Sequence, residues 1–401
     1  MRSTQVVMRA LTRDGAEARF VGGAVRNALL DEKVGDIDIA TPLVPEEVMA
    51  RLQAAGLGAV PTGIAHGTIT AIAGGRPFEV TTLRRDVTTD GRRATVAFST
   101  NWAEDAARRD FTMNALYAGE DGKIFDYTGG LADLRARRVR FVGDPRTRIR
   151  EDYLRILRLF RFHAWYGKGE IDRKALAAAV EEKAGLKTLS GERVQKEVLR
   201  LLAARDPAPT VAAMQRTGIL AEILPEKLQL PRLARLVAIE AANKTSADAL
   251  LRLAALLPDD PKTGRALSDA LKLSNADRER LVEALESDRR IAAPLLPSEA
   301  RKLLYRLGKR CFRDQLVLRR AEAHAKSEEP RLGALSKLAN SWVKPEFPLN
   351  GRDAMAAGID EGPKIGAVLR ALEQEWIEGD FQADRRALLK RLRETVKKPR
   401  K

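Results

Sequence analysis

The fold of the first part of this chain is decided by the stretch RFVGGAVRNALL, residues 19–30, together with GDIDI, residues 35–39. Residues 19–21 form a β-type run, and a helix-forming run over 24–30 follows them after two glycines. Glycines between a strand and a helix let backbone N–H groups approach a phosphate, and the helix N-terminus adds its positive end. Arg26 lies in the first helical turn, where we expect it to reach the same anion. Most Gly-Gly turns taken alone only change the direction of the chain.

Two aspartates follow this turn. In a β-strand residues i and i+2 point to the same face, so Asp36 and Asp38 are predicted to present two carboxylates side by side. Two like charges are unfavourable there unless a cation lies between them. Mg2+ binds one or two carboxylates together with substrate phosphates. A bare D-x-D is as often a solvated pair on an edge strand, but the phosphate-type turn before it favours a Mg2+ site.

Two further segments carry polar residues of interest. Glu79, in the strand-like run FEVTT of residues 78–82, is a candidate third carboxylate for the metals, although a lone strand glutamate is more often simply exposed. The segment RRDFTMNAL, residues 108–116, is predicted to be helical, which would place Asp110 and Asn114 on one side. That pair suits a ribose hydroxyl, with Arg109 near a triphosphate. An ordinary amphipathic helix with a surface polar pair is the alternative.

A basic ridge is predicted in EDYLRILRLFRF, residues 151–162. Asp152, Arg155, Arg158 and Arg161 recur at every third position, so on a helix they trace a slowly winding line. The residues between them are apolar and supply the side that faces the core. A basic line is usually a solvated face, but three arginines beside so much apolar surface favour a semi-buried wall for a ligand.

The chain is long enough for several domains, and its two parts read differently. Short β-type runs lie in the first 140 residues or so, at 18–21, 36–40, 67–72, 78–82 and 95–98. From about Asp144 onward helical periodicity takes over, at 153–166, 174–182, 194–203, 247–257 and 277–291. The predicted fold class is therefore α+β, with a small mixed head domain followed by an extended all-α part.

The charge balance predicts a polyanionic partner. The chain has 71 Lys and Arg against 55 Asp and Glu, a net charge of +16, which favours nucleic acid first and an acidic membrane second. No run of about 18 apolar residues occurs, so no membrane span is expected. The single cysteine, Cys311, excludes an internal disulfide and fits a reducing compartment. We therefore expect a cytoplasmic protein.

Four motifs together resemble one enzyme family. GGAVRNALL, GDIDIA, RRDFTMNAL and EDYLRILRLFRF occur in the order and at spacings compatible with the class II tRNA nucleotidyltransferases and bacterial poly(A) polymerases, a branch of the polymerase-β-like nucleotidyltransferases. The resemblance covers residues 20–202, about half of the chain. It implies triphosphate binding by Gly23 and Arg26, metal binding by Asp36 and Asp38, triphosphate and ribose contacts by Arg109 and Asp110, and a nucleotide pocket lined by Asp152, Arg155, Arg158 and Arg161.

The resemblance also implies a domain plan and partners. The expected parts are a catalytic head at 1–138, a helical neck with the nucleotide-reading helix at 139–205, a helical body at 206–300 and a helical, tRNA-binding tail at 301–401. The run AHGTIT at residues 65–70 and the stretch 86–102 look like those of CCA-adding members. The expected partners are tRNA, CTP and ATP; no stable protein partner is implied. A poly(A) polymerase, an enzyme adding only part of CCA, and a non-catalytic RNA-binding protein are the alternatives.

Template-independent addition requires the protein itself to recognise the base. Cytosine and adenine both present an exocyclic amino donor beside a ring-nitrogen acceptor, whereas uracil and guanine present a carbonyl beside an N–H. A carboxylate accepting from the amino group and a guanidinium donating to the ring nitrogen select the first pair. Asp152 and Arg155 are the right residue types for this task, and two Mg2+ ions held by Asp36 and Asp38 would support the transfer.

Overall fold

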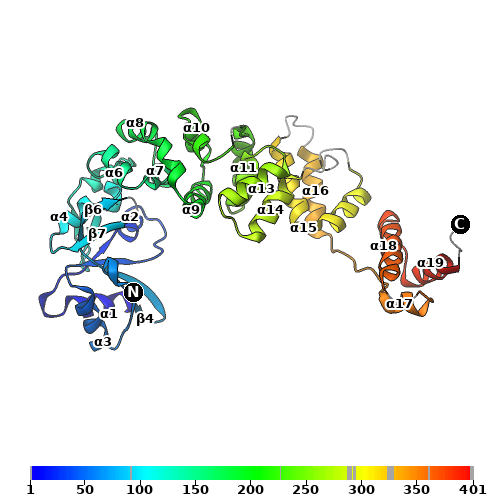
Figure 1. Cartoon of the computed structure of the whole chain (residues 1–401), viewed down its shortest axis with the longest axis horizontal. Coiled ribbons are helices and arrows are strands. Elements are labelled where there is room, and N and C mark those ends of the chain that lie inside the picture. The colour runs from blue at the N-terminus through cyan, green and yellow to red at the C-terminus, as the bar shows by residue number, and fades with distance from the viewer. Residues whose placement is uncertain are drawn as a thin grey trace. The chain divides into compact units, whose positions relative to one another are not determined.

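A computed structural model describes residues 2–90, 93–225, 227–286, 291, 295–322, 329–359 and 362–397 (Figure 1). The chain divides into two compact units, Met1–Glu226 and Lys227–Lys401. The strands lie in the first unit, and the described residues from Gly130 onward form helices and their connections. The predicted α+β class, a mixed head followed by a helical part, is therefore confirmed.

The strands of the first unit form a mixed sheet and a separate hairpin. Seven of them pair in the order β3-β4-β5-β2-β1-β8-β9, and β6 pairs with β7. Within the larger sheet β2 and β5 run parallel and the other neighbours run antiparallel. The strands are β1 (Arg19–Val21), β2 (Asp38–Thr41), β3 (Gly58–Gly63), β4 (Thr68–Ala73), β5 (Arg76–Thr82), β6 (Arg84–Asp90), β7 (Arg93–Phe98), β8 (Leu116–Ala118) and β9 (Ile124–Asp126).

Asp38 lies on the face of the sheet opposite to its apolar core. The helices α1 (Arg2–Thr12) and α3 (Pro45–Ala54) pack on the sheet, where Met8 and Leu52 meet Ile39 in one buried apolar cluster. Successive strand residues point to opposite faces. Because Ile39 faces this core, Asp38 points away from it.

The other helices of the first unit follow the hairpin or connect the strands. α7 packs against α9, so the predicted nucleotide-reading helix lies beside a later helix of the same unit (Figure 1). The α-helices are α2 (Gly23–Leu29), α4 (Trp102–Ala107), α5 (Gly130–Arg135), α6 (Pro145–Glu151), α7 (Leu154–Tyr166), α8 (Arg173–Glu181), α9 (Gly191–Leu202) and α10 (Ala208–Arg216). The 3-10 helices are Arg13–Gly15, Ile64–His66, Thr112–Asn114, Lys183–Thr188 and Leu220–Glu222.

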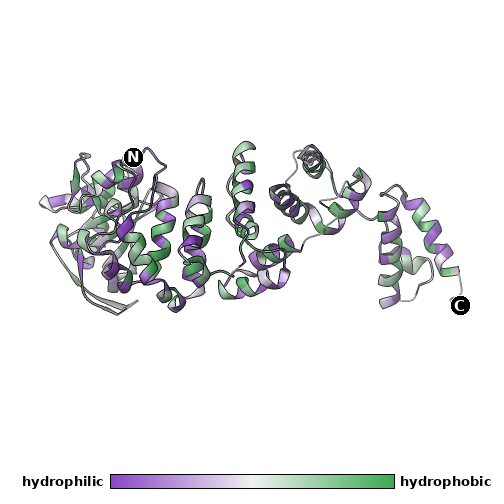
Figure 2. Cartoon of the chain, turned by 90° about the horizontal axis from the view of Figure 1, so that it is seen from above, coloured by the Kyte–Doolittle hydropathy of each residue, from purple (hydrophilic) through white to green (hydrophobic). Residues whose placement is uncertain are grey.

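The second unit is helical in its described residues. Hydrophilic and hydrophobic residues alternate along its helices, as they do in the first unit (Figure 2). None of the described helices in either unit is long and apolar enough to cross a membrane. The helices are α11 (Leu230–Ala242), α12 (Ala249–Leu256), α13 (Pro261–Ala270), α14 (Asn275–Leu285), α15 (Pro297–Glu322), α16 (Glu329–Ser341), α17 (Gly351–Ala356), α18 (Pro363–Glu378) and α19 (Arg385–Lys397).

Two local predictions are wrong. Asp36 was expected inside a strand, but β2 begins at Asp38 and Asp36 lies in the bend before it. The segment 108–116 was expected to be one helix; it contains an isolated bridge at Phe111, a single 3-10 turn and the first residue of β8. Strand-type pairing takes precedence here over local helix preference, because Phe111 bridges Phe141 and Leu116 pairs with Asp126 of β9. The predicted domain boundaries at 138/139, 205/206 and 300/301 stay predictions.

Candidate active site

One cleft in the first unit gathers most of the residues that the sequence singles out. It has a volume of about 520 Å3. Gly23, Arg26, Asp38, Arg109, Asp110, Asp152, Arg155 and Arg158 line it, together with Gly22, Arg108, Asn114, Leu154, Phe162 and Arg193. Asp36, Glu79 and Arg161 were also predicted site residues, and they lie outside this lining. The cleft is strongly polar and rich in arginine, which suits a phosphate-bearing ligand.

The glycine turn forms part of the lining of the cleft. Gly22 has a φ of +70°, a conformation that side-chain-bearing residues rarely adopt, and its carbonyl accepts the first hydrogen bond of α2 from the Arg26 N–H at 3.0 Å. A Cβ on Gly22 would lie 3.7 Å from Arg109 Nη1 and 4.0 Å from Asp38 Oδ2. The turn therefore adjoins both the arginine and the carboxylate that the sequence predicts for the same site.

Arg26 links this turn to α7. Its side chain is buried, and its Nη2 donates to Tyr166 Oη at 2.9 Å while the guanidinium carbon lies 4.0 Å from the centre of the Tyr166 ring. Its Nη1 donates to Asn114 Oδ1 at 2.5 Å. Burial lowers the pKa of Arg26, an effect that the hydroxyl of Tyr166 and the carboxylate of Asp110 oppose. The sequence did not indicate the role of Tyr166, which lies 140 residues from Arg26.

The carboxylates near Asp38 fit a bound divalent cation. Asp38 pairs in register with Glu79 across β2 and β5. Burial raises the pKa of Asp38, and the negative charges of Glu79 and Asp36 raise it further, against the opposing effect of Arg109. A cation relieves this crowding. No cluster of three or more His, Cys, Asp or Glu side chains able to hold a metal occurs among the described residues.

Arg108 and Arg109 are held by Asp105, which the sequence reasoning missed. Arg109 Nη2 lies 2.9 Å from Asp105 Oδ2, and Arg108 Nη2 lies 2.6 Å from Asp105 Oδ1. Tyr117 donates to the same carboxylate at 2.7 Å. Burial alone would raise the pKa of Asp105, but the two arginines outweigh it, so the pKa lies below its ordinary value. The spacing of Asp105 and Arg109, four residues at the end of α4, is the signal that could have revealed the pair.

Asp110 and Asn114 share one side although no α-helix joins them. Asn114 Nδ2 donates to Asp110 Oδ1 at 3.0 Å, and Arg158 Nε donates to Asp110 Oδ2 at 2.9 Å. Burial would raise the pKa of Asp110, but Arg158 and these hydrogen bonds hold it below its ordinary value. The predicted pairing of Asp110 with Asn114 is confirmed, and its predicted helical cause is wrong.

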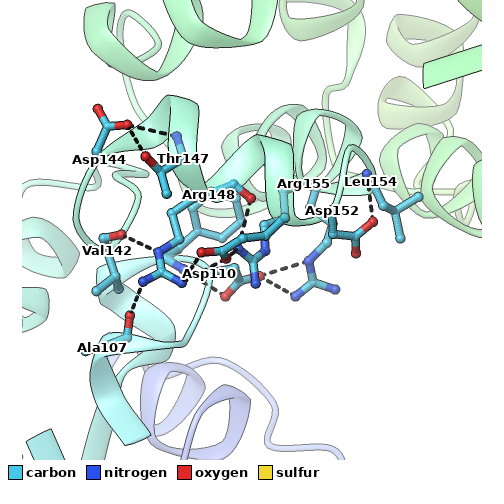
Figure 3. A network of polar contacts seen from close by, with 12 residues as sticks. Ala107, Asp110, Val142, Asp144, Thr147, Arg148, Asp152, Leu154 and Arg155 are labelled. Carbon is cyan, nitrogen blue, oxygen red and sulfur yellow. Dashed lines mark hydrogen bonds and ion pairs between the residues drawn. The ribbon is translucent and has the colours of Figure 1, made fainter. Parts of the chain in front are cut away.

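The predicted base-reading residues lie in a network of ion pairs (Figure 3). Asp152 Oδ1 accepts from the Leu154 N–H at 3.1 Å, and Asp152 Oδ2 lies 2.7 Å from Arg193 Nη2. Arg155 pairs with Glu151 and donates to the Arg148 carbonyl at 2.9 Å. Arg193 lines the cleft but the sequence reasoning missed it, because it lies 41 residues from Asp152.

Arg161, the last arginine of the predicted ridge, points towards α9 and not into the cleft. Arg161 Nε lies 2.6 Å from Glu197 Oε2, and Arg158 Nη1 lies 3.9 Å from Glu197 Oε1. Arg161 lies outside the lining of the cleft, so the ridge predicted over 152–161 divides between the cleft and the interface of α7 with α9. The functional roles predicted for these residues stay predictions.

Comparison with known proteins identifies the family. A model described as the poly A polymerase head domain matches residues 18–140, and one described as the probable RNA- and SrmB-binding site of polymerase A matches residues 170–229. The mitochondrial CCA tRNA nucleotidyltransferase 1 of Mus musculus is 34% identical over 397 residues, which cover 96% of this chain and 88% of that protein. The CCA-adding enzyme of Levilactobacillus brevis is 33% identical, with 96% and 95% covered.

A solved structure agrees with these sequence relatives. The Bacillus stearothermophilus CCA-adding enzyme in complex with CTP superimposes with a TM-score of 0.78 at 27% identity, covering 98% of this chain and 97% of that one. The similarity thus extends through both compact units, well beyond the four motifs in residues 22–162. The chain belongs to the family of the CCA-adding tRNA nucleotidyltransferases.

Proposed function

We propose that this protein adds C, C and A to the 3' end of tRNA, using CTP and ATP and no nucleic-acid template. The observation that carries the proposal is the single cleft in which Asp38, the glycine turn at Gly23 and the carboxylate of Asp152 lie together. The names of the mouse and Levilactobacillus relatives and the CTP-bound Bacillus enzyme support the same activity.

The family uses a divalent metal, and we propose that it is Mg2+. Asp36 and Asp38 are the proposed ligands, and Glu79 adds negative charge beside them. Two such ions, held by these carboxylates, would supply the Lewis acidity that activates the 3'-hydroxyl of the tRNA and stabilises the pyrophosphate leaving group. The glycine turn at Gly23 and the guanidinium groups of Arg26 and Arg109 bind and orient the triphosphate.

The remaining cleft residues orient the nucleoside. Asp110 accepts a hydrogen bond from the ribose, and Arg158 and Asn114 keep that carboxylate ionised and in place. Asp152 accepts from the amino group of cytosine or adenine, and Arg155 donates to the neighbouring ring nitrogen. Arg161 does not line the cleft, and it supports the nucleotide pocket indirectly, through its ion pair with Glu197.

Product length tests the activity. The full-length protein is incubated with Mg2+, CTP, ATP and a tRNA that ends at the discriminator base. The expected product is longer by three nucleotides and then stops. A long A tract identifies a poly(A) polymerase, an early stop identifies a partial enzyme, and no addition leaves a non-catalytic RNA-binding protein.

Asp152→Ala tests how the base is selected. If Asp152 accepts from the base, this variant loses its preference for CTP and ATP over UTP and GTP by about one to two orders of magnitude, the value of a hydrogen bond to a charged group. If Asp152 only supports the start of α7 through Leu154, the melting temperature falls and all four nucleotides slow equally. That second result would contradict the base-reading role.

The location and the finer domain plan are also proposed. We propose a cytoplasmic protein, which its single, buried Cys311 supports, and the head, neck, body and tail boundaries given above. Imaging of a fluorescent fusion in the cell of origin tests the location, since membrane or organelle fluorescence would contradict it.

A further inference from the structure

One face of α9 carries two charged residues that pair with residues of the predicted nucleotide pocket. Arg193 and Glu197 are four residues apart, which places them on the same side of the helix. Arg193 pairs with Asp152, and Glu197 pairs with Arg161. Val194 belongs to the buried side of α9, which packs against α7. The helix α9 therefore places a cation beside a carboxylate that lies two residues before the start of α7.

The carboxylate of Asp152 is held from two directions. One oxygen accepts from the Leu154 N–H at 3.1 Å and the other lies 2.7 Å from Arg193 Nη2. The two side chains are 26% and 25% exposed, so they are partly shielded from water but open to the cleft. A carboxylate has about four acceptor positions on its two oxygens, so these partners leave positions for a further donor.

The two contacts fix the direction of the Asp152 carboxylate, which is what selection of a base by hydrogen bonding requires. Discrimination between amino and carbonyl groups depends on an acceptor whose direction is fixed before the nucleotide arrives, because a freely rotating carboxylate accommodates several bases. Leu154 fixes one oxygen only through the backbone. Arg193, which lies on another helix, restricts rotation of the whole carboxylate about its χ angles.

We propose that Arg193 is a positioning residue that sets the nucleotide preference by fixing the direction of the Asp152 carboxylate. The inference rests on the proposed role of Asp152 in reading the base. Arg193 acts through Asp152 and needs no contact with the base. Two other roles are open to a cleft arginine: binding the triphosphate, which affects all four nucleotides alike, and holding α9 to α7, which affects stability.

The test uses the full-length protein and compares Arg193→Ala, Arg193→Lys and Asp152→Ala. For each, kcat and KM are measured with CTP, ATP, UTP and GTP on tRNA lacking CCA, with the melting temperature. Arg193→Ala is expected to lower the preference for CTP over UTP by about tenfold, the lower end for a hydrogen bond to a charged group. Arg193→Lys should restore part of it, because an ammonium pairs with the carboxylate but lacks the planar fork.

A matched control and a double variant make the result specific. Arg150 of α6 pairs with Glu182 at 2.8 Å, its side chain is more exposed than that of Arg193, and it lies outside the lining of the cleft. Arg150→Ala removes the same charge nearby and should leave the preference unchanged. Because Arg193 acts through Asp152, the variant with both Arg193→Ala and Asp152→Ala should lose no more preference than Asp152→Ala alone.

The possible results distinguish the positioning role of Arg193 from the base-reading role of Asp152 on which it rests. If Asp152→Ala loses the preference and Arg193→Ala keeps it, the positioning role is overturned and base reading stands. If Asp152→Ala keeps the preference, both are overturned. A uniform rise in KM for all four nucleotides in Arg193→Ala shows triphosphate binding and also overturns the inference. Should Arg193→Ala unfold, Arg193→Lys decides: an unchanged CTP-to-UTP preference alongside a lowered melting temperature means a structural role only.

Discussion

Asp105 and Arg109 form an ion pair of 2.9 Å in which the carboxylate is 1% exposed and the guanidinium lines the cleft. The same carboxylate pairs with Arg108 and accepts from Tyr117. A buried anion thus holds two arginines at the place where a triphosphate is proposed to bind.

Replacing Asp105 with Asn should therefore affect both stability and nucleotide binding. Removing one partner of a buried ion pair costs about 3 kcal/mol, at the lower end of its usual range because the arginines reach solvent. The KM for CTP should rise as both arginines lose their fixed positions. Urea unfolding and steady-state kinetics measure the two effects. The neighbouring Glu104→Gln, at an exposed residue that accepts from Ser99, is the control. A stable Asp105→Asn protein with unchanged KM would contradict this.

Gly22→Ala should damage the cleft through the backbone. Gly22 has a φ of +70° and a ψ of −127°, where a Cβ is strained, and we expect a cost of about 1–3 kcal/mol. The turn would also move away from Arg109, so the KM for nucleotides should rise. Gly35→Ala is the control for melting temperature, because Gly35 is not in the left-handed region and its added Cβ meets nothing within 4 Å. Equal melting temperatures for the two variants would disprove the strain.

Asp38→Asn should separate stability from activity. Nucleotide addition should disappear, because the variant loses a proposed metal ligand. The protein should be at least as stable as the wild type in metal-free buffer, because the variant removes a negative charge whose burial, together with repulsion from Glu79 and Asp36, raises the pKa of Asp38. Thermal unfolding with and without Mg2+ measures this: Mg2+ should stabilise the wild type and leave Asp38→Asn unaffected. Full activity in this variant would remove the metal assignment.

Acid should weaken the first unit through Asp105 and Asp110. Both carboxyls have a folded pKa below the unfolded value of about 3.9. Their contribution to stability is thus fully present above that pH and is lost as pH falls below it towards the folded pKa. Urea unfolding measured from pH 7 down to about pH 3 should show this loss, and Asp110→Asn should show a shallower one. Parallel curves for the two proteins would count against the shifted pKa of Asp110.

Affinity for tRNA should fall steeply with salt. The chain carries a net charge of +16, and neutralising phosphates releases counterions. A groove along α19 in the second unit is lined by Arg386, Lys390 and Arg393, among others. Changing these three to Gln should weaken binding and reduce the slope of log K against log salt by about 0.9 for each phosphate that the variant no longer neutralises. An unchanged slope would mean that tRNA binds outside α19.

The sequence alone determined the class of fold and predicted the chemistry of the site. The Gly22-Gly23 turn and a metal site at the acidic pair that ends at Asp38 could be predicted, because a tight turn and a metal each demand particular residue types within a short stretch. Helical periodicity likewise located α7, which starts one residue after its predicted beginning at Tyr153. Such local requirements are readable without knowing what lies across the molecule.

Only the tertiary structure decided which charged groups hold one another. Asp152 meets Arg193 of α9, and Arg26 meets Tyr166, through pairings that join residues distant in sequence. Sequence spacing cannot give such pairings, because they depend on how α9 packs on α7 and how α7 meets the head. The segment around Asp110 shows the same limit. Its residues favour a helix locally, but the bridge of Phe111 with Phe141 and the pairing of Leu116 in the sheet leave room for a single 3-10 turn, because tertiary context here overrides local preference.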